Sequence, residues 1–187
     1  MDPLLIDFPE SFDTQRLTIR SPRAGEGAEV NAAVMESLEE LQLWMPWANP
    51  APTVEDTEKY TRQALAKFIA REELALRFFL KGTDTFVGSS GLMVRGWDVP
   101  AFEIGYWVRR RFAGQGYVTE AVRAIAAKGF EVLKAERIEI RTDERNVRSW
   151  RVAERCGFRL EATLRHDSRT PQGVLRNTRV YVRLKGE

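Results

Sequence analysis

The sequence contains a single cysteine, Cys156, and a single histidine, His166. One cysteine cannot close a disulfide within the chain, and one cysteine with one histidine leaves no zinc-type spacing. No run of about 18 apolar residues occurs, and the N-terminal segment carries acids and prolines where a signal peptide has a basic start and an apolar stretch. We therefore expect a cytoplasmic protein with no disulfide, no metal and no membrane partner.

Internal repeats, low-complexity tracts and Gly/Ser-rich linkers are also absent from the sequence. The chain has 187 residues, of which 43% are hydrophobic, and a chain of this size can bury one substantial core. We therefore expect a single domain over residues 1–187.

The net charge is only +2, yet acidic residues prevail up to residue 108 and basic residues prevail after it. A basic C-terminal half suits an anionic ligand, such as a phosphate-bearing cofactor or a nucleic acid, and an acidic N-terminal half suits a cationic partner. Solvated surface charge explains the same distribution equally well. Because the sequence has no basic-aromatic recognition module, we do not expect nucleic-acid binding.

The spacing of apolar residues predicts strands and helices in alternation. Residues 14–20 alternate like a half-buried strand, and residues 30–41 repeat at helical spacing. Thr53 and Asp56 form a capping-box pattern for a second helix, which we expect to end near Arg71. Three β-rich runs separated by turns then predict an antiparallel meander over residues 74–80, 85–95 and 101–109.

The spacing of apolar residues changes twice in the second half of the chain. Residues 116–134 have helical spacing and residues 137–142 alternate, which predicts a strand-helix-strand unit with a parallel pair of strands. A short helix over residues 147–155 ends before Gly157, which suits a left-handed cap. Two final strands follow, over residues 158–165 and 174–184. The predicted fold is a mixed α/β sheet in the order βααβββαβαββ.

A glycine-containing turn, RRRFAGQGYVTEA over residues 109–121, lies between a predicted strand and a predicted helix. Gly114 and Gly116 can adopt positive φ and let a ligand approach the backbone, and the first N–H groups of the following helix have no partner within the helix. Free donors at the positive end of a helix suit a pyrophosphate. Taken alone, the two glycines are also typical of an ordinary turn.

The chain here resembles the GNAT superfamily of N-acetyltransferases, whose signature R/Q-x-x-G-x-G/A is matched by Arg111, Gly114 and Gly116. Other segments fall in the order of its RimJ/RimL-like branch: TQRLTIR is similar to the first strand, EIGYW to the fourth strand, and GQGYVTEAV to the cofactor loop and helix. RNVRSWRVAERCGF, over residues 145–158, is similar to the N-x-x-S-x-x-x-x-x-x-x-G-F segment that supports the pantetheine arm. The resemblance extends over residues 14–184.

This resemblance implies a GNAT fold: a central mixed, mostly antiparallel sheet of seven strands, splayed between strands 4 and 5 and flanked by about four helices. Acetyl-CoA is the implied cosubstrate, without a metal, and its pantetheine arm is expected to lie in the splay like an extra strand. At least one arginine of residues 109–111 is expected to contact it, although such a run is also typical of solvated charge. The residues predicted to bind acetyl-CoA are Trp107, Val108, Arg109, Arg111, Phe112, Ala113, Gly114, Gln115, Gly116, Tyr117 and Asn146.

Amide formation needs a neutral amine and hydrogen-bond donors for the oxyanion and the leaving thiolate. Glu103 is the candidate base, because the resemblance places its strand beside the acetyl group, and an N–H near Val108 is the candidate oxyanion donor. Ala153 stands where many members have a tyrosine acid, so Ser149, where RimL-like enzymes use serine, is the candidate donor to the sulfur. A solvent-facing Glu103 and a merely helix-facing Ser149 are the alternatives. Cys156 is expected to be a buried structural thiol, since direct transfer needs no acyl-cysteine.

The acceptor side carries fewer signals. RimL-like proteins place a second carboxylate in the loop after the sixth strand; Ser168 aligns with it and Asp167 is adjacent, which makes Asp167 a candidate in the acceptor site. His166 titrates in a useful range, but an isolated loop histidine is more often solvent-exposed. Trp44 and Trp47 either line the acceptor entrance or belong to the core or to a homodimer interface.

The leading hypothesis is acetylation of the N-terminal α-amine of a protein, a ribosomal one by resemblance. Such an amine has a reference pKa of about 8, against about 10.4 for lysine, so a weak base suffices. Acetylation of a small amine, such as a polyamine, an amino sugar or an antibiotic, is an alternative, which the acidic N-terminal half would favour. A non-catalytic module that binds CoA as an effector is a third, because the tyrosine is missing and the second carboxylate is displaced.

Overall fold

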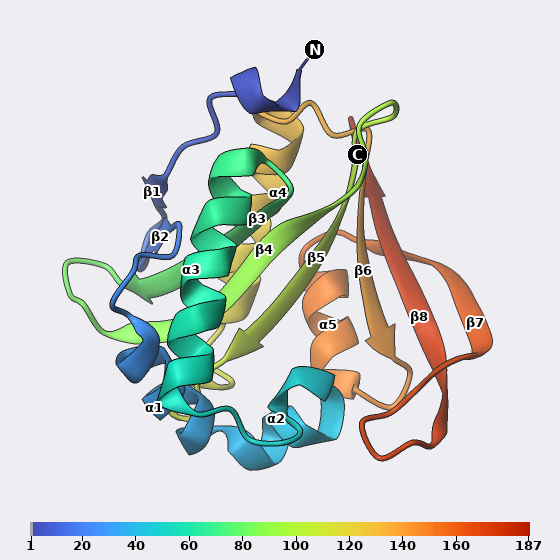
Figure 1. Ribbon diagram of the computed structural model, residues 1–187. Helices are drawn as coiled ribbons and strands as arrows, with labels where there is room; N and C mark the ends of the chain where they lie inside the picture. Colours follow the sequence, from blue (N-terminus) through green and yellow to red (C-terminus); the bar gives the residue numbers. More distant parts are fainter. Residues whose placement is uncertain (1) are drawn as a thin grey trace.

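In a computed structural model that describes residues 2–187, eight strands form one mixed sheet and five α-helices pack on its two faces (Figure 1). The strand order is β1-β2-β3-β4-β5-β6-β8-β7. The strands are β1 (Ser11–Asp13), β2 (Leu17–Arg20), β3 (Glu73–Leu80), β4 (Phe86–Gly96), β5 (Ala101–Val108), β6 (Arg137–Asp143), β7 (Arg159–Arg169) and β8 (Leu175–Leu184). The helices are α1 (Gly27–Glu36), α2 (Leu38–Trp44), α3 (Val54–Ala70), α4 (Tyr117–Glu131) and α5 (Val147–Arg155), with 3-10 turns η1 (Pro3–Leu5), η2 (Pro46–Ala48) and η3 (Arg110–Phe112).

The predicted order of elements is confirmed, with one strand added and one helix divided. β1 is too short to show an alternation of apolar and polar residues, so the sequence did not predict it. It pairs with β2 through Phe12 and Ile19, and the sheet therefore has eight strands where seven were expected. The helix expected over residues 30–41 is divided at Ser37, whose hydroxyl donates to the carbonyl of Ala33 (2.8 Å). Such a side-chain bond to the backbone competes with helix continuation.

The sheet opens between β5 and β6. These two strands run parallel and pair only over residues 101–103 of β5 and residues 137–139 of β6, whereas the other neighbouring strands run antiparallel. Beyond Glu103 the backbone of β5 is paired with β4 alone. The predicted splay is confirmed, and α5 lies behind the opening (Figure 1).

The main core lies between the sheet and α4. Ala121, Val122 and Ile125 of α4 are fully buried in one cluster with Leu92 of β4, as their helical spacing predicted. Gly129 allows close contact of α4 with the sheet, because a Cβ there would lie 2.8 Å from Cδ1 of an isoleucine on β6. α4 is therefore fixed firmly on the sheet, and so is the turn that leads into it.

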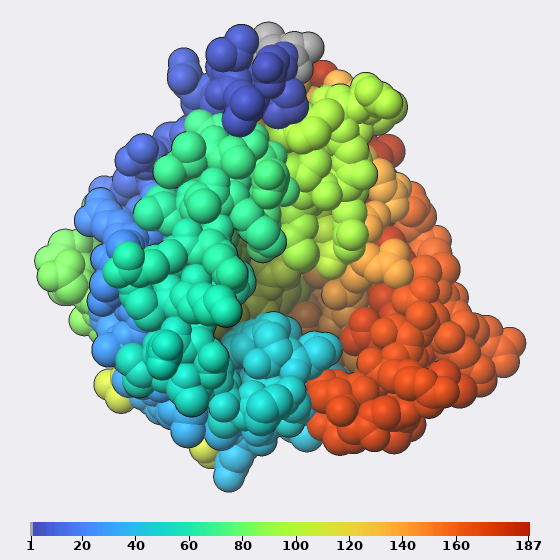
Figure 2. All heavy atoms as spheres, viewed as in Figure 1, coloured from blue at the N-terminus to red at the C-terminus, as the bar shows by residue number. Residues whose placement is uncertain are grey.

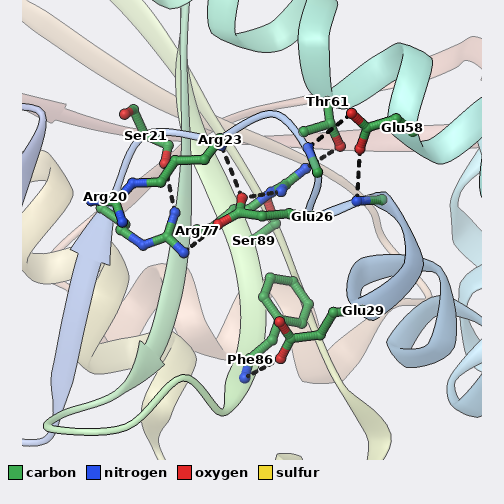
Figure 3. Close-up of polar contacts among 12 residues, drawn as sticks. Arg20, Ser21, Arg23, Glu26, Glu29, Glu58, Thr61, Arg77, Phe86 and Ser89 are labelled. Carbon is green, nitrogen blue, oxygen red and sulfur yellow. Dashed lines mark hydrogen bonds and ion pairs between the residues drawn. The ribbon is translucent and has the colours of Figure 1, made fainter.

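A group of charged side chains around the buried Arg77 fixes α1 and α3 on the other face (Figure 3). Arg77 of β3, whose side chain is 3% exposed, is ion-paired with Glu26 at the start of α1 and donates to Thr61 of α3 (2.6 Å). Glu26 is also ion-paired with Arg20 of β2. Glu58 of α3 accepts two backbone N–H groups at the start of α1, at 2.9 Å each. These contacts also determine where the C-terminal end of α1 lies.

Candidate active site

The turn between β5 and α4 presents a row of free backbone donors. η3 uses the N–H groups of Phe112 and Ala113 in its own hydrogen bonds (2.9 and 3.0 Å). In the described part of the chain, the N–H groups of residues 114–119 have no hydrogen-bond partner, and Glu120 donates the first bond of α4, to the carbonyl of Gly116 (3.0 Å). The amides open to a ligand therefore begin at residue 114.

Gly114 and Gly116 give this turn its shape. Both adopt the left-handed region, with φ of 77° and 82°, in which glycine is strongly favoured. Gly116 is the N-cap of α4 and has no side chain that could cap the helix. The positive end of the helix dipole thus faces outward, in the arrangement that binds anions.

Arg16, at the start of β2, supports the turn from the other side. Its guanidinium donates to the carbonyl of Gln115 (3.0 Å), is ion-paired with Glu120 (2.6 Å) and lies 4.4 Å from the centre of the Tyr117 ring. Sequence reasoning missed this residue, because its partners lie about a hundred positions further along the chain. Arg16 links the first strands to the turn.

The arginines that begin the turn point toward α1. Glu36, the last residue of α1, accepts from Nε of Arg109 (2.7 Å) and from Nε of Arg111 (2.8 Å). The hydrogen bonds from Arg111, followed by those from Arg109, lower the pKa of the Glu36 carboxyl from 4.5 to about 2. The arginine run is therefore an ion-paired cluster in this structure rather than a freely solvated charge.

Backbone contacts also join this turn to the junction of α1 and α2. The N–H of Arg110 donates to the hydroxyl of Ser37 (2.9 Å), and its guanidinium contacts Glu39 and Glu40 of α2 (3.4 and 3.3 Å). The N–H of Arg111 donates to the carboxylate at the end of α1 (3.2 Å). The turn and α2 are consequently held as one unit.

Two hydroxyl groups meet where β5 and β6 separate. Asn146 caps α5 by accepting the N–H of Ser149 (3.2 Å), and its side-chain nitrogen makes no hydrogen bond within residues 2–187. The hydroxyl of Ser149 donates to that of Tyr106 (3.2 Å), which in turn donates to the Ser149 carbonyl (2.9 Å). Burial raises the pKa of Tyr106 well above its usual value. Alternation along β5 would have placed Tyr106 on the inner face but indicated no partner for it.

Glu103 lies on the opposite face of β5 from Tyr106, since the two residues are an odd number of positions apart. It stands on the last paired rung, across from Glu139 of β6, and is ion-paired with Arg95 of β4. A cavity of about 440 Å³ lies beside this rung. Its lining residues are Arg95, Ala101, Phe102, Arg137, Glu139 and Arg141.

Trp47, one of the two tryptophans predicted for the acceptor site, lies near the end of β5. The ring of Trp47 is 6.1 Å from that of Trp107, which in turn lies 5.6 Å from Phe86. Trp47 is 47% exposed, and Trp44 at the end of α2 is half-buried. The structure therefore brings Trp47 and Trp107, two residues assigned to different ligands, into one aromatic cluster.

Asp167 is held by a contact with β6. It is ion-paired with Arg141 (3.0 Å) and belongs to β7, within an irregular stretch where His166 has φ of 51°. The expected loop after the sixth strand is therefore a bulged strand, because the pairing between β7 and β8 resumes at Ser168. The side chain of Gln172, in the β7–β8 hairpin, donates to the carbonyl of Gln42 in α2 (2.9 Å).

The contact between that hairpin and α2 closes one end of a hollow. Figure 2 shows the hollow above α2 (blue), with α3 (green) on one side and the β7–β8 segment (orange) on the other. In Figure 1 the separated ends of β5 and β6 lie at this level. The hollow thus reaches the opening of the sheet from the face that carries Glu103.

Cys156 lies behind the turn at the end of α5. It is buried, and its thiol donates to the carbonyl of Thr119 (3.5 Å). Burial raises the pKa of this thiol to about 11, which disfavours the nucleophilic thiolate. The arrangement agrees with a packing role for this cysteine.

Within residues 2–187 no three His, Cys, Asp or Glu side chains are grouped as metal ligands. No helix in the same range is long and apolar enough to cross a membrane. Free amides suit an anion, the unpaired edge of β5 suits an extended arm, and a carboxylate and a hydroxyl pair lie on opposite faces of the opening.

Known proteins resemble the chain in sequence and in fold. The model of the acetyltransferase (GNAT) domain family matches residues 16–159. The probable N-acetyltransferase YjcK of Bacillus subtilis (strain 168) is 35% identical over 126 residues, which cover 66% of this chain and 69% of that protein. RimL, a ribosomal L7/L12 α-N-protein acetyltransferase solved with coenzyme A, has a TM-score of 0.85 at 20% identity and covers 95% of this chain and 97% of its own. The microcin C7 self-immunity acetyltransferase MccE, solved with acetyl-CoA and AMP, has a TM-score of 0.85 at 21% identity over 91% of this chain and 93% of its own.

Proposed function

The chain belongs to the GNAT family of acetyltransferases, and on this premise we propose that it transfers the acetyl group of acetyl-CoA to the N-terminal α-amine of a protein. The observation that carries the proposal is the row of unpaired amides over residues 114–119, beside the unpaired edge of β5. A diphosphate at these amides would direct the rest of the cosubstrate along that edge.

Acetyl-CoA supplies the acetyl group as a thioester, and several groups of this chain fit its polar parts. The amides of residues 114–119 would bind the diphosphate, and the free side-chain nitrogen of Asn146 would bind an amide oxygen of the arm. The N–H of Arg109 donates to the carbonyl of Val87 on the β4 side (2.8 Å). Because successive N–H groups of a strand point to opposite edges, that of Val108 points toward the opening. It is the proposed oxyanion donor.

The two faces of the opening suit the two proton-handling roles. Glu103 would accept the proton of the amine through a water molecule on the face that the hollow reaches. Ser149 would donate its hydroxyl hydrogen to the sulfur as the thiolate leaves on the other face. If the amine attacks from the face of Glu103, the thiolate departs on the opposite face, where the hydroxyl of Ser149 lies.

A protein α-amine suits this site better than a lysine side chain does. One oxygen of Glu103 is already engaged by Arg95, and an α-amine, with a reference pKa of about 8, needs little help to lose its proton. The cavity of about 440 Å³ next to Glu103 offers room for residues that follow the first one. RimL, which shares the fold, is named as an α-N-protein acetyltransferase. MccE, which shares it as well, is named for microcin immunity, and so a small amine is the alternative acceptor.

The acceptor class is tested with peptides and small amines under one set of conditions. We expect CoA release with peptides that begin with serine or alanine, α-acetylated products by mass spectrometry, and no product with spermidine or with peptides whose N-terminus is blocked. Acetylated spermidine without acetylated peptide would overturn the protein-acceptor proposal. CoA binding by calorimetry without transfer to any amine would identify a non-catalytic module instead.

The assigned residues are tested with Glu103→Gln, Ser149→Ala and the control Glu73→Gln, which removes an ion-paired glutamate from β3, outside the proposed site. We expect Glu103→Gln to lower kcat by roughly 100-fold, the lower end of the range for general-base catalysis. Ser149→Ala should lower kcat by roughly 10-fold, as for the loss of one hydrogen bond to a charged group. Glu73→Gln should stay within about threefold of the parent enzyme, and CoA affinity should be retained in all three. Unchanged turnover in both Glu103→Gln and Ser149→Ala would contradict the assigned roles.

A further inference from the structure

The hydroxyl of Tyr106 makes two hydrogen-bond contacts with Ser149, which is more than packing of the ring would require. Its hydroxyl lies within hydrogen-bond distance of two oxygens of the same serine, the carbonyl at 2.9 Å and the hydroxyl at 3.2 Å. Tyr106 comes from β5, beyond the last rung shared with β6, and Ser149 comes from the first turn of α5. The two hydroxyls therefore meet at the opening of the sheet.

We propose that Tyr106 is a positioning residue that acts through Ser149, so that the two hydroxyls together stabilise the leaving thiolate. This inference rests on the proposed function, in which Ser149 donates to the sulfur. Tyr106 supports the Ser149 hydroxyl from the neighbouring strand through the two contacts given above.

The two hydroxyl hydrogens can change partners without any movement of heavy atoms. Before transfer, Ser149 donates to Tyr106 and Tyr106 donates to the Ser149 carbonyl. The amine nitrogen bonds to the acetyl carbon and the C–S bond breaks, with its electron pair staying on sulfur. As this happens, the serine hydrogen turns to the sulfur and the tyrosine hydrogen turns to the serine oxygen. Neither hydroxyl loses its proton. Glu103 takes the proton of the amine through water and returns it to solvent, and the thiolate is finally protonated from solvent. Donors in such a chain polarise each other and bind an anion more strongly than one donor alone.

The surroundings of Tyr106 keep its hydroxyl neutral and in place. Burial raises the pKa of Tyr106, so the hydroxyl keeps its hydrogen at working pH. The groups around it are Ser149, Cys156, Arg155 and Tyr181. Its backbone is paired with Ser90 of β4, whose own hydroxyl donates to the carbonyl of the preceding glycine on β5 (2.7 Å). The hydroxyl therefore acts as a fixed neutral donor, and an ionised tyrosine is not required.

Tyr181 provides a matched control. It is a buried tyrosine of β8 whose hydroxyl donates to Glu154 of α5 (3.2 Å), so it also ties α5 to the sheet. It makes no hydrogen bond with Ser149. Tyr181→Phe removes a contact between helix and sheet of the same kind and leaves the hydroxyl pair intact, whereas Tyr106→Phe removes the pair.

The first test uses steady-state kinetics of Tyr106→Phe, Ser149→Ala, the double variant and Tyr181→Phe. We expect Tyr106→Phe to lower kcat about tenfold with little change in KM for acetyl-CoA, and the double variant to be no slower than Ser149→Ala. Tyr181→Phe should keep the parent kcat within about twofold. An unchanged kcat in Tyr106→Phe, or losses that multiply in the double variant, would overturn the paired action of the two hydroxyls.

The second test needs no acceptor, so its failure is separable from a failure of the proposed function. The ultraviolet absorbance of the thiolate of bound CoA is titrated against pH in the parent protein and in the same variants. Tyr106→Phe and Ser149→Ala should each move the midpoint of this titration upward by about one pH unit, and Tyr181→Phe should not. Equal midpoints in the parent protein and Tyr106→Phe would refute the pair even if the protein acetylates peptides. A clear upward shift would support it even if the acceptor proved to be a small amine.

Discussion

Replacing Gly114 with alanine should weaken CoA binding much more than it weakens the fold. Gly114 has φ of 77°, and apart from Gly114 itself and its two chain neighbours, no heavy atom of the described chain lies within 4 Å of the position that a Cβ would take. The methyl group therefore causes no clash in the free protein, and the cost to stability is that of a left-handed alanine, about 1 kcal/mol. Displacing a phosphate oxygen from one amide of the row removes a hydrogen bond to a charged group, worth roughly 1.5–3 kcal/mol. The Kd for CoA should then rise about 10- to 150-fold.

Gly82→Ala is the control for this prediction. Gly82 lies in the β3–β4 turn, has φ of 76° and is equally free of neighbours within 4 Å. Both variants should lower the melting temperature by about 2–4 °C, but only Gly114→Ala should raise the Kd measured by calorimetry. If Gly114→Ala bound CoA like the parent protein while both variants lost the same stability, the diphosphate would not lie over this turn.

Two further predictions concern stability. Because the folded-state pKa of Glu36 is lowered to about 2 from 4.5, its ion pairs with Arg109 and Arg111 should stabilise the protein fully above about pH 4.5 and progressively less as the pH falls toward 2. The difference in unfolding free energy between the parent and Glu36→Gln, measured with urea, should therefore shrink below about pH 4.5, and a constant difference would contradict the ion-pair assignment. Glu26→Ala should cost about 3 kcal/mol in urea unfolding at neutral pH, because it leaves the guanidinium of Arg77, 3% exposed, without its carboxylate. The exposed pair of Arg62 with Glu58 is the control, and Arg62→Ala should cost less than about 0.5 kcal/mol; equal losses in the two variants would refute the argument from burial.

Local signals in the sequence predicted most of the fold. The capping box of Thr53 and Asp56 starts α3, and Arg71 ends it in the left-handed conformation. The helical spacing before residue 134 and the alternation after residue 136 correspond to α4 and β6. These predictions succeed because the apolar residues of an amphipathic helix or strand recur at a fixed spacing within one short segment of sequence. β1 escaped because three residues are too few to establish a period.

The candidate site was predictable only in its backbone parts. Gly114 and Gly116 predicted a turn with free backbone amides. Which amides are free depends on the 3-10 turn before Gly114, and no sequence pattern predicted that turn. The predicted roles of Glu103 and Ser149 came from resemblance, and they stay predictions. The proximity of Tyr106 to Ser149 could not be read from either segment alone.

The sequence by itself determined most of the order of the elements, the glycine turn before α4 and the capping box of α3, because each depends on residues a few positions apart. Only the tertiary structure decided which side chains meet. Arg16 contacts Gln115 across 99 positions, Arg111 contacts Glu36 across 75, and Tyr106 contacts Ser149 across 43. Such contacts exist because the sheet and its helices pack in one arrangement, and no local pattern encodes the partner that packing brings to a side chain.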